Sequence, residues 1–187
     1  MAYLEKKLPR SIGIFYRIRQ YLSDTALKSL YFSFVYSHLQ LAIDAWGGVG
    51  ITTWNPLNVL HKIIRAMAHS SFRTKITPLY KTLNLLKLDD IYSHALGKIM
   101  HKIHSGNLSG TFNRLFTPAN QVHCHATRSA TRGAYFWQMT LPNTEKRSLK
   151  HLGPKIWDNI HPSLHDSTPL TFKKQYRDVL ISVYDDR

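Results

Sequence analysis

The sequence predicts a mainly α-helical protein. We expect a three-helix bundle over residues 1–75, then a C-terminal region over residues 76–187 that is helical apart from a short extended or irregular segment. Two observations lead to this fold class. Apolar residues recur three and four positions apart in several separate stretches, as on the buried face of a helix, and capping residues or prolines stand where those stretches begin. With 187 residues, 43% of them hydrophobic, the chain is able to bury a real core.

Capping and periodicity define the first three helices. The first carries Ile14, Phe15, Ile18 and Leu22 at helical spacing. Ser23 or Asp24 can cap a second helix that runs to about Ile43. Asn55 and Pro56 begin a third, because proline is well tolerated in a first helical turn. This third helix has an apolar stripe (Leu57, Leu60, Ile64, Met67) and a basic stripe (Lys62, Arg65, His69).

Similar signals organise the C-terminal region. A short helix is predicted over residues 77–85, and Asp89 and Asp90 place negative charge at the start of another that runs to about His104. The mixture of Thr, Ala and aromatic residues over about 122–145 indicates an extended or irregular segment, and prolines punctuate the chain that follows. The final helix is predicted over about 169–184, with Phe172, Tyr176, Val179 and Val183 inward and Lys173, Lys174 and Arg177 outward.

Charge and cysteine content narrow the class of protein. The net charge is +14, and the chain up to Lys75 and the chain after it each carry about +7, which favours a polyanionic partner. The most apolar stretch, Leu30–Trp46, contains polar side chains and falls short of the ~20 apolar residues that span a bilayer, so we expect it to be a buried helix. No membrane partner is expected. Cys124 is the only cysteine, so no intramolecular disulfide and no cysteine-based zinc finger can form. We expect an intracellular protein, nuclear or cytoplasmic.

Six local phrases follow one another along the chain: Ser11-Ile-Gly-Ile-Phe-Tyr-Arg-Ile-Arg-Gln-Tyr-Leu22, Ala45-Trp-Gly-Gly48, Asn55-Pro-Leu-Asn-Val-Leu60, Pro78-Leu-Tyr-Lys-Thr-Leu-Asn-Leu-Leu-Lys-Leu-Asp-Asp90, His125-Ala-Thr-Arg-Ser129 and Gly153-Pro-Lys-Ile-Trp-Asp-Asn159. Their content and order resemble the region downstream of the polymerase core in reverse transcriptases of non-LTR (LINE-type, jockey-like) retrotransposons, over about residues 6–180. The resemblance implies a thumb-like helical bundle and a C-terminal accessory region of an RNA-directed DNA polymerase. It also implies that the opening Met-Ala-Tyr-Leu-Glu is a gene-model start inside a longer reading frame.

No catalytic residue is expected in this chain. A reverse transcriptase holds two metal ions on carboxylates, so the parent polymerase would use Mg, whereas this fragment would use no cofactor. Tyr184-Asp185-Asp186 lacks the extra residue before the aspartates, and Leu88-Asp89-Asp90 is explained by helix capping. The eleven histidines match no metal-ligand spacing, including His94, His101 and His104 and the pair flanking Cys124. We therefore expect surface or capping histidines, no metal site, and rank a metal-dependent nuclease last.

With no catalytic or metal site expected, the sequence favours a nucleic-acid-binding surface. Five cations, interleaved with Tyr16 and Tyr21, crowd the first helix without an acid among them. The resemblance implies contact with an RNA–DNA or RNA duplex, independent of sequence, and a palm and fingers core as a further partner. The alternatives are a solvated basic face, or a free-standing nucleic-acid-binding module derived from such an element. The candidate nucleic-acid-binding residues are Lys6, Lys7, Arg10, Arg17, Arg19, Lys62 and Arg65, with Arg128 and Arg132 as a weaker group. Trp46, Trp157, Phe34 and Tyr31 are predicted to be core residues.

Overall fold

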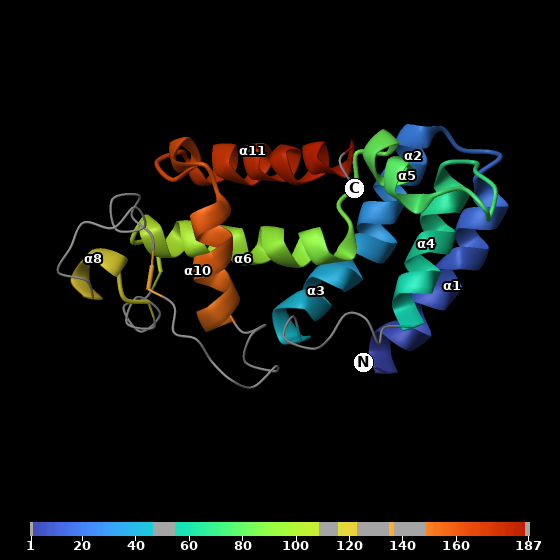
Figure 1. The fold of residues 1–187 in the computed structure, drawn as a ribbon. Coiled ribbons are helices and arrows are strands. Elements are labelled where there is room, and N and C mark those ends of the chain that lie inside the picture. The colour runs from blue at the N-terminus through green and yellow to red at the C-terminus, as the bar shows by residue number, and fades with distance from the viewer. Residues whose placement is uncertain (1, 47–54, 109–115, 123–134, 137–148, 186–187) are drawn as a thin grey trace. The chain divides into compact units, whose positions relative to one another are not determined.

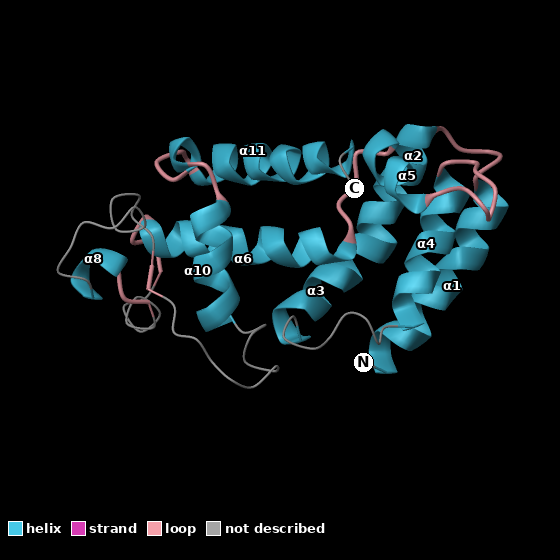
Figure 2. Cartoon of the chain, in the orientation of Figure 1, coloured by secondary structure: helices cyan, strands magenta, loops and turns pink. Residues whose placement is uncertain are grey.

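The computed structural model describes residues 2–46, 55–108, 116–122, 135–136 and 149–185. These residues are mainly helical, which confirms the predicted fold class (Figure 2). Within these ranges no strand forms, and the only β pairing is an isolated antiparallel bridge between Pro118 and Tyr135. Most of the segment predicted to be extended or irregular lies outside the described residues.

The chain divides into two compact units. The first unit comprises Met1–Trp46, Gly50–Ile91 and Leu180–Arg187, and the second comprises Gly47–Val49 and Tyr92–Val179. The first unit thus continues beyond Lys75, where the sequence division was drawn, and includes the end of the chain. One physical reason is a hydrogen bond of 2.6 Å that the Tyr184 hydroxyl donates to Oδ2 of Asp90, which joins segments far apart in sequence.

The three helices predicted for the first unit all form. Ser23 caps the second as expected, its side chain accepting from the amide of Ala26 at 3.4 Å. Leu22 differs from the prediction, because it follows the first helix in a turn and does not belong to it. The second predicted helix is one helical run with a π-helical stretch in its middle. The helices are α1 (Ala2–Ile18), α2 (Asp24–Tyr31), η1 (Phe32–Tyr36), α3 (Ser37–Trp46) and α4 (Asn55–Met67).

The π-helical stretch keeps one stripe of the second helical run facing the core. In an α-helix, residues four apart drift slowly around the axis, and a π-helical turn holds more residues and so offsets that drift. Residues at steps of four are accordingly all buried: Leu27, Tyr31, Val35 and Leu39. Phe34 falls beside this stripe and is 48% exposed, so its prediction as a core residue was wrong, whereas Tyr31 is confirmed.

The core of the first unit lies where α1 packs against α4. Figure 1 shows these helices side by side and running in the same direction. Phe15 of α1 and Ile63 and Ile64 of α4 are buried. Short α5 (Ile76–Thr82) packs on α4 and on the terminal 3-10 turn η5 (Val183–Asp185). The parallel course of α1 and α4 matters for the surface, because the loops that follow them emerge at the same end of the unit.

The second unit is built mainly from α6 (Leu88–His104), α10 (Leu149–Asn159) and α11 (Pro169–Ser182), with short α8 (Ala119–Val122) and the 3-10 turn η4 (Pro162–Leu164). α6 begins in the first unit and α11 ends there. Their second-unit parts run antiparallel (Figure 1), since His94 contacts Tyr176 and His101 contacts Phe172.

One helix of this unit was not predicted, and two positions predicted to face inward are exposed. Residues 149–159 form a helix through Pro154, because packing of the buried side chains of His151, Pro154 and Trp157 outweighs the hydrogen bond that proline removes. Val179 and, in η5 of the first unit, Val183 are 48% and 39% exposed, although both were expected to face inward. The burial of Trp157 is confirmed.

The histidines depart furthest from expectation. His94, His101, His151 and His165 are buried, so the prediction of surface or capping histidines was wrong for these four. His161 is exposed and does cap η4, its Nδ1 accepting from the amide of Ser163 at 3.3 Å.

Candidate nucleic-acid interface

The outer face of α1 carries three of the predicted cations. Lys7, Arg10 and Arg17 are exposed and are spaced by three and seven residues, so they share one stripe of the helix. The opposite stripe, with Leu8 and Phe15, is buried in the core. Asp24 is the only acidic residue between Lys7 and Leu41, which leaves this stripe strongly positive.

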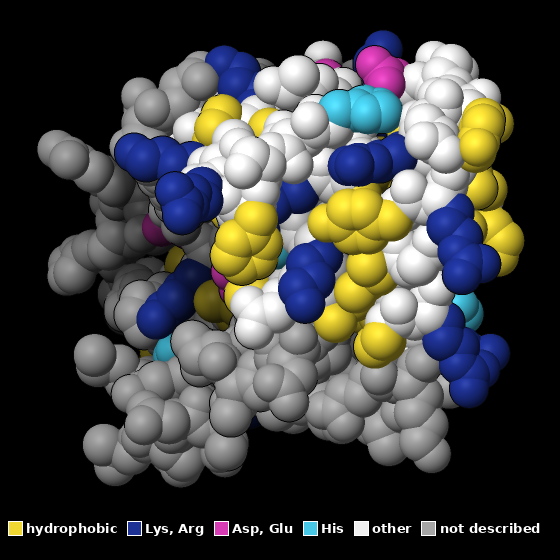
Figure 3. Space-filling view, turned by 90° about the vertical axis from the view of Figure 1, so that its right-hand side faces the viewer, with side chains coloured by type: hydrophobic (Ala, Val, Ile, Leu, Met, Phe, Trp, Pro, Cys, Tyr) yellow, Lys and Arg dark blue, Asp and Glu magenta, His cyan; other side chains and the backbone are white. Residues whose placement is uncertain are grey.

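α4 adds a fourth cation on the same side of the unit. Its buried positions, which include Leu60 and Ile64, leave a narrow exposed stripe on which Lys62 lies. Figure 3 shows the side of the molecule that α1 and α4 form, with dark blue Lys and Arg side chains spread over it and yellow apolar side chains between them. We call Lys7, Arg10, Arg17 and Lys62 the basic face.

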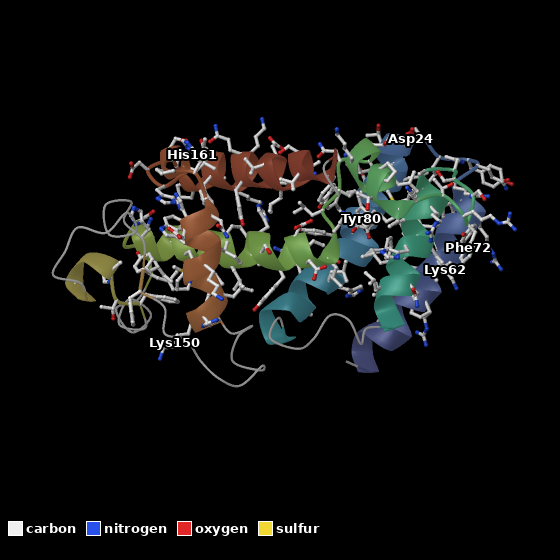
Figure 4. All side chains as sticks on the ribbon, in the orientation of Figure 1. Asp24, Lys62, Phe72, Tyr80, Lys150 and His161 are labelled. Atoms are coloured by element: carbon white, nitrogen blue, oxygen red, sulfur yellow. The ribbon has the colours of Figure 1, made fainter. Side chains whose placement is uncertain are left out.

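The loops after α1 and α4 extend this positive region with aromatic side chains. Tyr21 is 79% exposed and Phe72 is 74% exposed, which is unusual for side chains of this size. Arg19 is half-buried, with its guanidinium carbon 5.1 Å from the ring centre of Tyr16. Figure 4 labels Phe72 and Lys62 on the same side of the first unit. We call residues 19–22 and 72–75 the tip.

Arg65 has an intramolecular role in the structure. Its Nε and Nη2 donate to the carbonyl oxygen of Thr74 at 3.4 and 3.3 Å, and its guanidinium carbon lies 5.3 Å from the ring centre of Phe72. The side chain is half-buried, in contrast to exposed Lys62 one turn earlier. It therefore fixes the loop that carries Phe72, and a direct nucleic-acid contact of Arg65 stays a prediction.

Not every predicted residue can be placed. The backbone of Lys6 belongs to α1, but its side chain lies outside the described residues, as do Arg128 and Arg132. Sequence reasoning missed Phe72, Arg73 and Lys75. The signal available was the run Ser70-Ser-Phe-Arg-Thr-Lys75, a polar turn with two cations and one aromatic residue.

A second group of polar side chains lies inside the second unit. Each of three buried imidazoles stacks on an aromatic ring: His165 on Trp157 (ring centres 4.0 Å apart), His101 on Phe172 (4.3 Å) and His94 on Tyr176 (5.9 Å). Nε2 of His94 pairs with the carbonyl oxygen of Lys173 at 3.0 Å, and Nε2 of His101 pairs with that of Ser167 at 2.9 Å. These rings form a polar seam within an aromatic core.

Burial is the main cause of the electrostatics of this seam. It lowers the pKa of His94 from 6.5 to about 4, an effect opposed by the bond to Lys173 and strengthened by the nearby charges of Lys98 and Arg177. Burial also lowers the pKa of His101 and of His165. The imidazoles are therefore neutral at pH 7. No group of three or more His, Cys, Asp or Glu side chains able to hold a metal occurs in the described part of the chain.

The two motifs weighed as metal sites, Tyr184-Asp185-Asp186 and Leu88-Asp89-Asp90, are joined through Tyr184 and Asp90. Asp186 and the side chain of Asp185 lie outside the described residues. Besides its bond to Asp90, the Tyr184 hydroxyl accepts a hydrogen bond of 2.9 Å from the amide of Lys87. Asp89 is exposed in the first turn of α6. The described contacts of this region thus serve to fasten the end of the chain onto the start of α6.

Comparison with known proteins gives no relative: no family model, no curated protein and no solved structure matches this chain. Among the described residues, no helix is both long and apolar enough to cross a membrane.

Proposed function

We propose that this chain is a non-catalytic, sequence-independent nucleic-acid-binding segment, corresponding to the thumb and C-terminal region of a non-LTR retrotransposon reverse transcriptase. The observation that carries the binding role is the basic face together with the tip. Four exposed cations lie on two neighbouring helices, and exposed aromatic rings lie at the end of the same unit. Lysine and arginine neutralise phosphates, and aromatic faces accept stacked bases or sugars.

The geometry favours backbone contact over base reading. The cations of the basic face are spread along two helices, and those of α1 are separated by up to ten residues, which corresponds to about 15 Å along a helix. Charges distributed in this way can follow a phosphate backbone, and contacts to phosphate carry no sequence information. The assignment to a retroelement polymerase rests on the six sequence phrases, and the buried apolar helices of a thumb would hold such a surface rigid.

Salt dependence of binding tests the proposal. With four to six phosphate contacts, the logarithm of affinity should fall against the logarithm of salt concentration with a slope of about −3 to −5. The measurement is fluorescence anisotropy with RNA–DNA duplexes of two unrelated sequences, titrated at several salt concentrations. We expect the two sequences to bind equally within about threefold.

A pair of matched variants locates the surface. Replacing Lys7, Arg10, Arg17 and Lys62 by Gln removes four charges from the first unit with little change in helix propensity. The control replaces Lys102, Lys150, Lys173 and Lys174, four exposed lysines of the second unit. The first variant should flatten the slope by several units and the control by about one or less. A larger loss in the control, or a slope near zero for the unchanged chain, would rule out the basic face as the binding surface.

The polymerase assignment makes a separate prediction. On a primed RNA template with magnesium and deoxynucleotides, the purified chain should extend no primer, because the palm that carries the metal-binding carboxylates lies outside the region of resemblance. Primer extension that stays with the chain through a second purification step would contradict this assignment, whatever the binding data show.

A further inference from the structure

Beside the tip, the first unit contains a solvent-open pocket of about 550 Å³. One face of α5 and the terminal turn η5 form its walls. The side chains that define its chemistry are those of Lys75, Thr77, Lys81, Thr82 and Tyr184. None of the described residues that line it is acidic, and two of them are lysines. The pocket contains none of the residues that the sequence analysis selected for nucleic-acid binding.

Two lysines set the ligand that this pocket favours. Lys75 precedes α5, Lys81 stands in its last turn, and both are exposed. Ammonium groups at the walls of a concave site attract anionic groups, and lysine is a common point-charge ligand of phosphate. The hydroxyl of Thr82 donates to the carbonyl oxygen of Pro78 at 3.0 Å, so that hydroxyl has an acceptor within the helix.

The walls of the pocket are held in place before any ligand binds. The bonds from Arg65 to the carbonyl of Thr74 fix the loop one residue before Lys75. On the other wall, Tyr184 is buried, bonded to Asp90, and covered by the ammonium nitrogen of Lys87 at 4.3 Å from its ring centre. Such support lowers the conformational cost of binding.

We propose that this pocket binds the phosphate of a nucleotide unit. Its volume falls in the range of small-molecule sites, about 300–1,000 Å³, and so exceeds what a lone phosphate needs. Lys75 belongs to both the pocket and the tip, so a strand lying on the tip can place one of its phosphates between Lys75 and Lys81. This use of the pocket rests on the proposed function, whereas the preference for a phosphate group does not.

Chemical shifts of the ¹⁵N-labelled full chain test the site. Adenosine 5′-monophosphate and inorganic phosphate should shift the amide signals of residues 75–82, and adenosine, which lacks the phosphate, should not. Replacing Lys75 and Lys81 by Gln should weaken adenosine monophosphate binding at least tenfold. Replacing the exposed lysines Lys173 and Lys174 by Gln removes the same charge from the second unit and should leave the affinity within about twofold.

Competition separates the two possible sources of the phosphate. If a short oligonucleotide displaces adenosine monophosphate from the pocket, the nucleic-acid use is supported. Binding of adenosine monophosphate that an oligonucleotide does not displace would overturn that use and leave a site for free phosphate compounds. Equal shifts with adenosine and adenosine monophosphate, or unchanged binding after the Lys75 and Lys81 replacements, would overturn the pocket itself. The basic-face variants test the proposed function separately, because they leave the residues of the pocket unchanged.

Discussion

The two compact units place their nitrogen-containing side chains in opposite ways. The first exposes lysine and arginine on α1 and α4. The second buries His94, His101 and His165 against aromatic rings, where they are neutral at pH 7. Salt concentration should therefore control the affinity of the first unit for nucleic acid, and pH should control whether the second unit stays folded.

Both cores also contain polar atoms that have no hydrogen-bond partner among the described residues. In the first unit these are the hydroxyls of Tyr31 and Tyr80, and in the second they are Nε1 of Trp157 and Nε2 of His165. Burial raises the pKa of both tyrosines, so neither ionises near neutral pH. Of these four side chains, only the imidazole of His165 can gain a charge on mild acidification. Acid should therefore destabilise the core of the second unit, because a buried charge is costly.

The largest effect we expect is acid destabilisation of the second unit. The pKa of His94 is 6.5 when unfolded and about 4 when folded, so between these values the unfolded chain binds more protons. Stability is complete above about pH 6.5 and falls as the pH drops towards 4. His94 alone accounts for up to about 3 kcal/mol, and His101 and His165 add to it with the same sign. Urea unfolding followed by near-UV circular dichroism at pH 7, 6 and 5 measures the loss.

Variants assign this pH dependence to the seam. His94→Gln removes one titrating group and should reduce the slope of unfolding free energy against pH, although it also lowers stability at pH 7. Exposed His69 has a positive φ of 50°, which asparagine accommodates well, so His69→Asn should leave the slope unchanged. A slope that His94→Gln leaves intact would assign the pH dependence elsewhere.

A smaller effect should come from the close approach of α6 and α11 in the second unit. A Cβ atom at Gly97 would lie 2.5 Å from Cε1 of Tyr176, which is shorter than any real contact. Gly97→Ala should therefore destabilise the protein by about 1–3 kcal/mol despite alanine's better helix propensity. At Gly153 the nearest atom is the flexible Sδ of Met100, at 2.8 Å, so Gly153→Ala should cost less. Equal losses for the two variants would show that the Gly97 contact relaxes freely.

The two units also differ in how much of their helical structure could be predicted from the sequence. The helices of the first unit were predictable because local signals agreed with tertiary packing: the Ser23 cap, the proline at the start of α4 and the apolar stripe through Leu60 and Ile64. The second unit was less predictable, because α10 continues through Pro154 and buries His151 and Trp157. A proline in the sequence predicts a break in a helix, and the sequence does not show that tertiary packing stabilises the helix there.

The candidate surface was only partly predictable for a similar reason. The sequence placed Lys7, Arg10 and Arg17 in a dense basic cluster on the first helix, and Lys62 on a basic stripe of the third. It could not show that Arg65 turns inward to Thr74, or that Lys75 shares a pocket with Tyr184 more than a hundred residues later. Burial of the histidines was missed because an imidazole is polar by composition, and only its stacking partners make an interior place favourable.

The smallest effect we expect is a gain in stability in the first unit. Gly13 lies on the exposed side of α1, and a Cβ atom there would meet nothing within 4 Å. Alanine in a helix interior is favoured over glycine by about 0.5–1 kcal/mol, chiefly because glycine loses more backbone freedom on folding. Gly13→Ala should therefore raise the free energy of unfolding by about that amount, measured by urea titration.

Because Gly13 stands between Arg10 and Arg17, the same variant also tests the basic face: a methyl group adds no charge, so the salt slope of binding should not change. A loss of stability would contradict the open environment of this position, and a changed slope would indicate that the nucleic acid approaches the α1 backbone more closely than phosphate contacts by long side chains require.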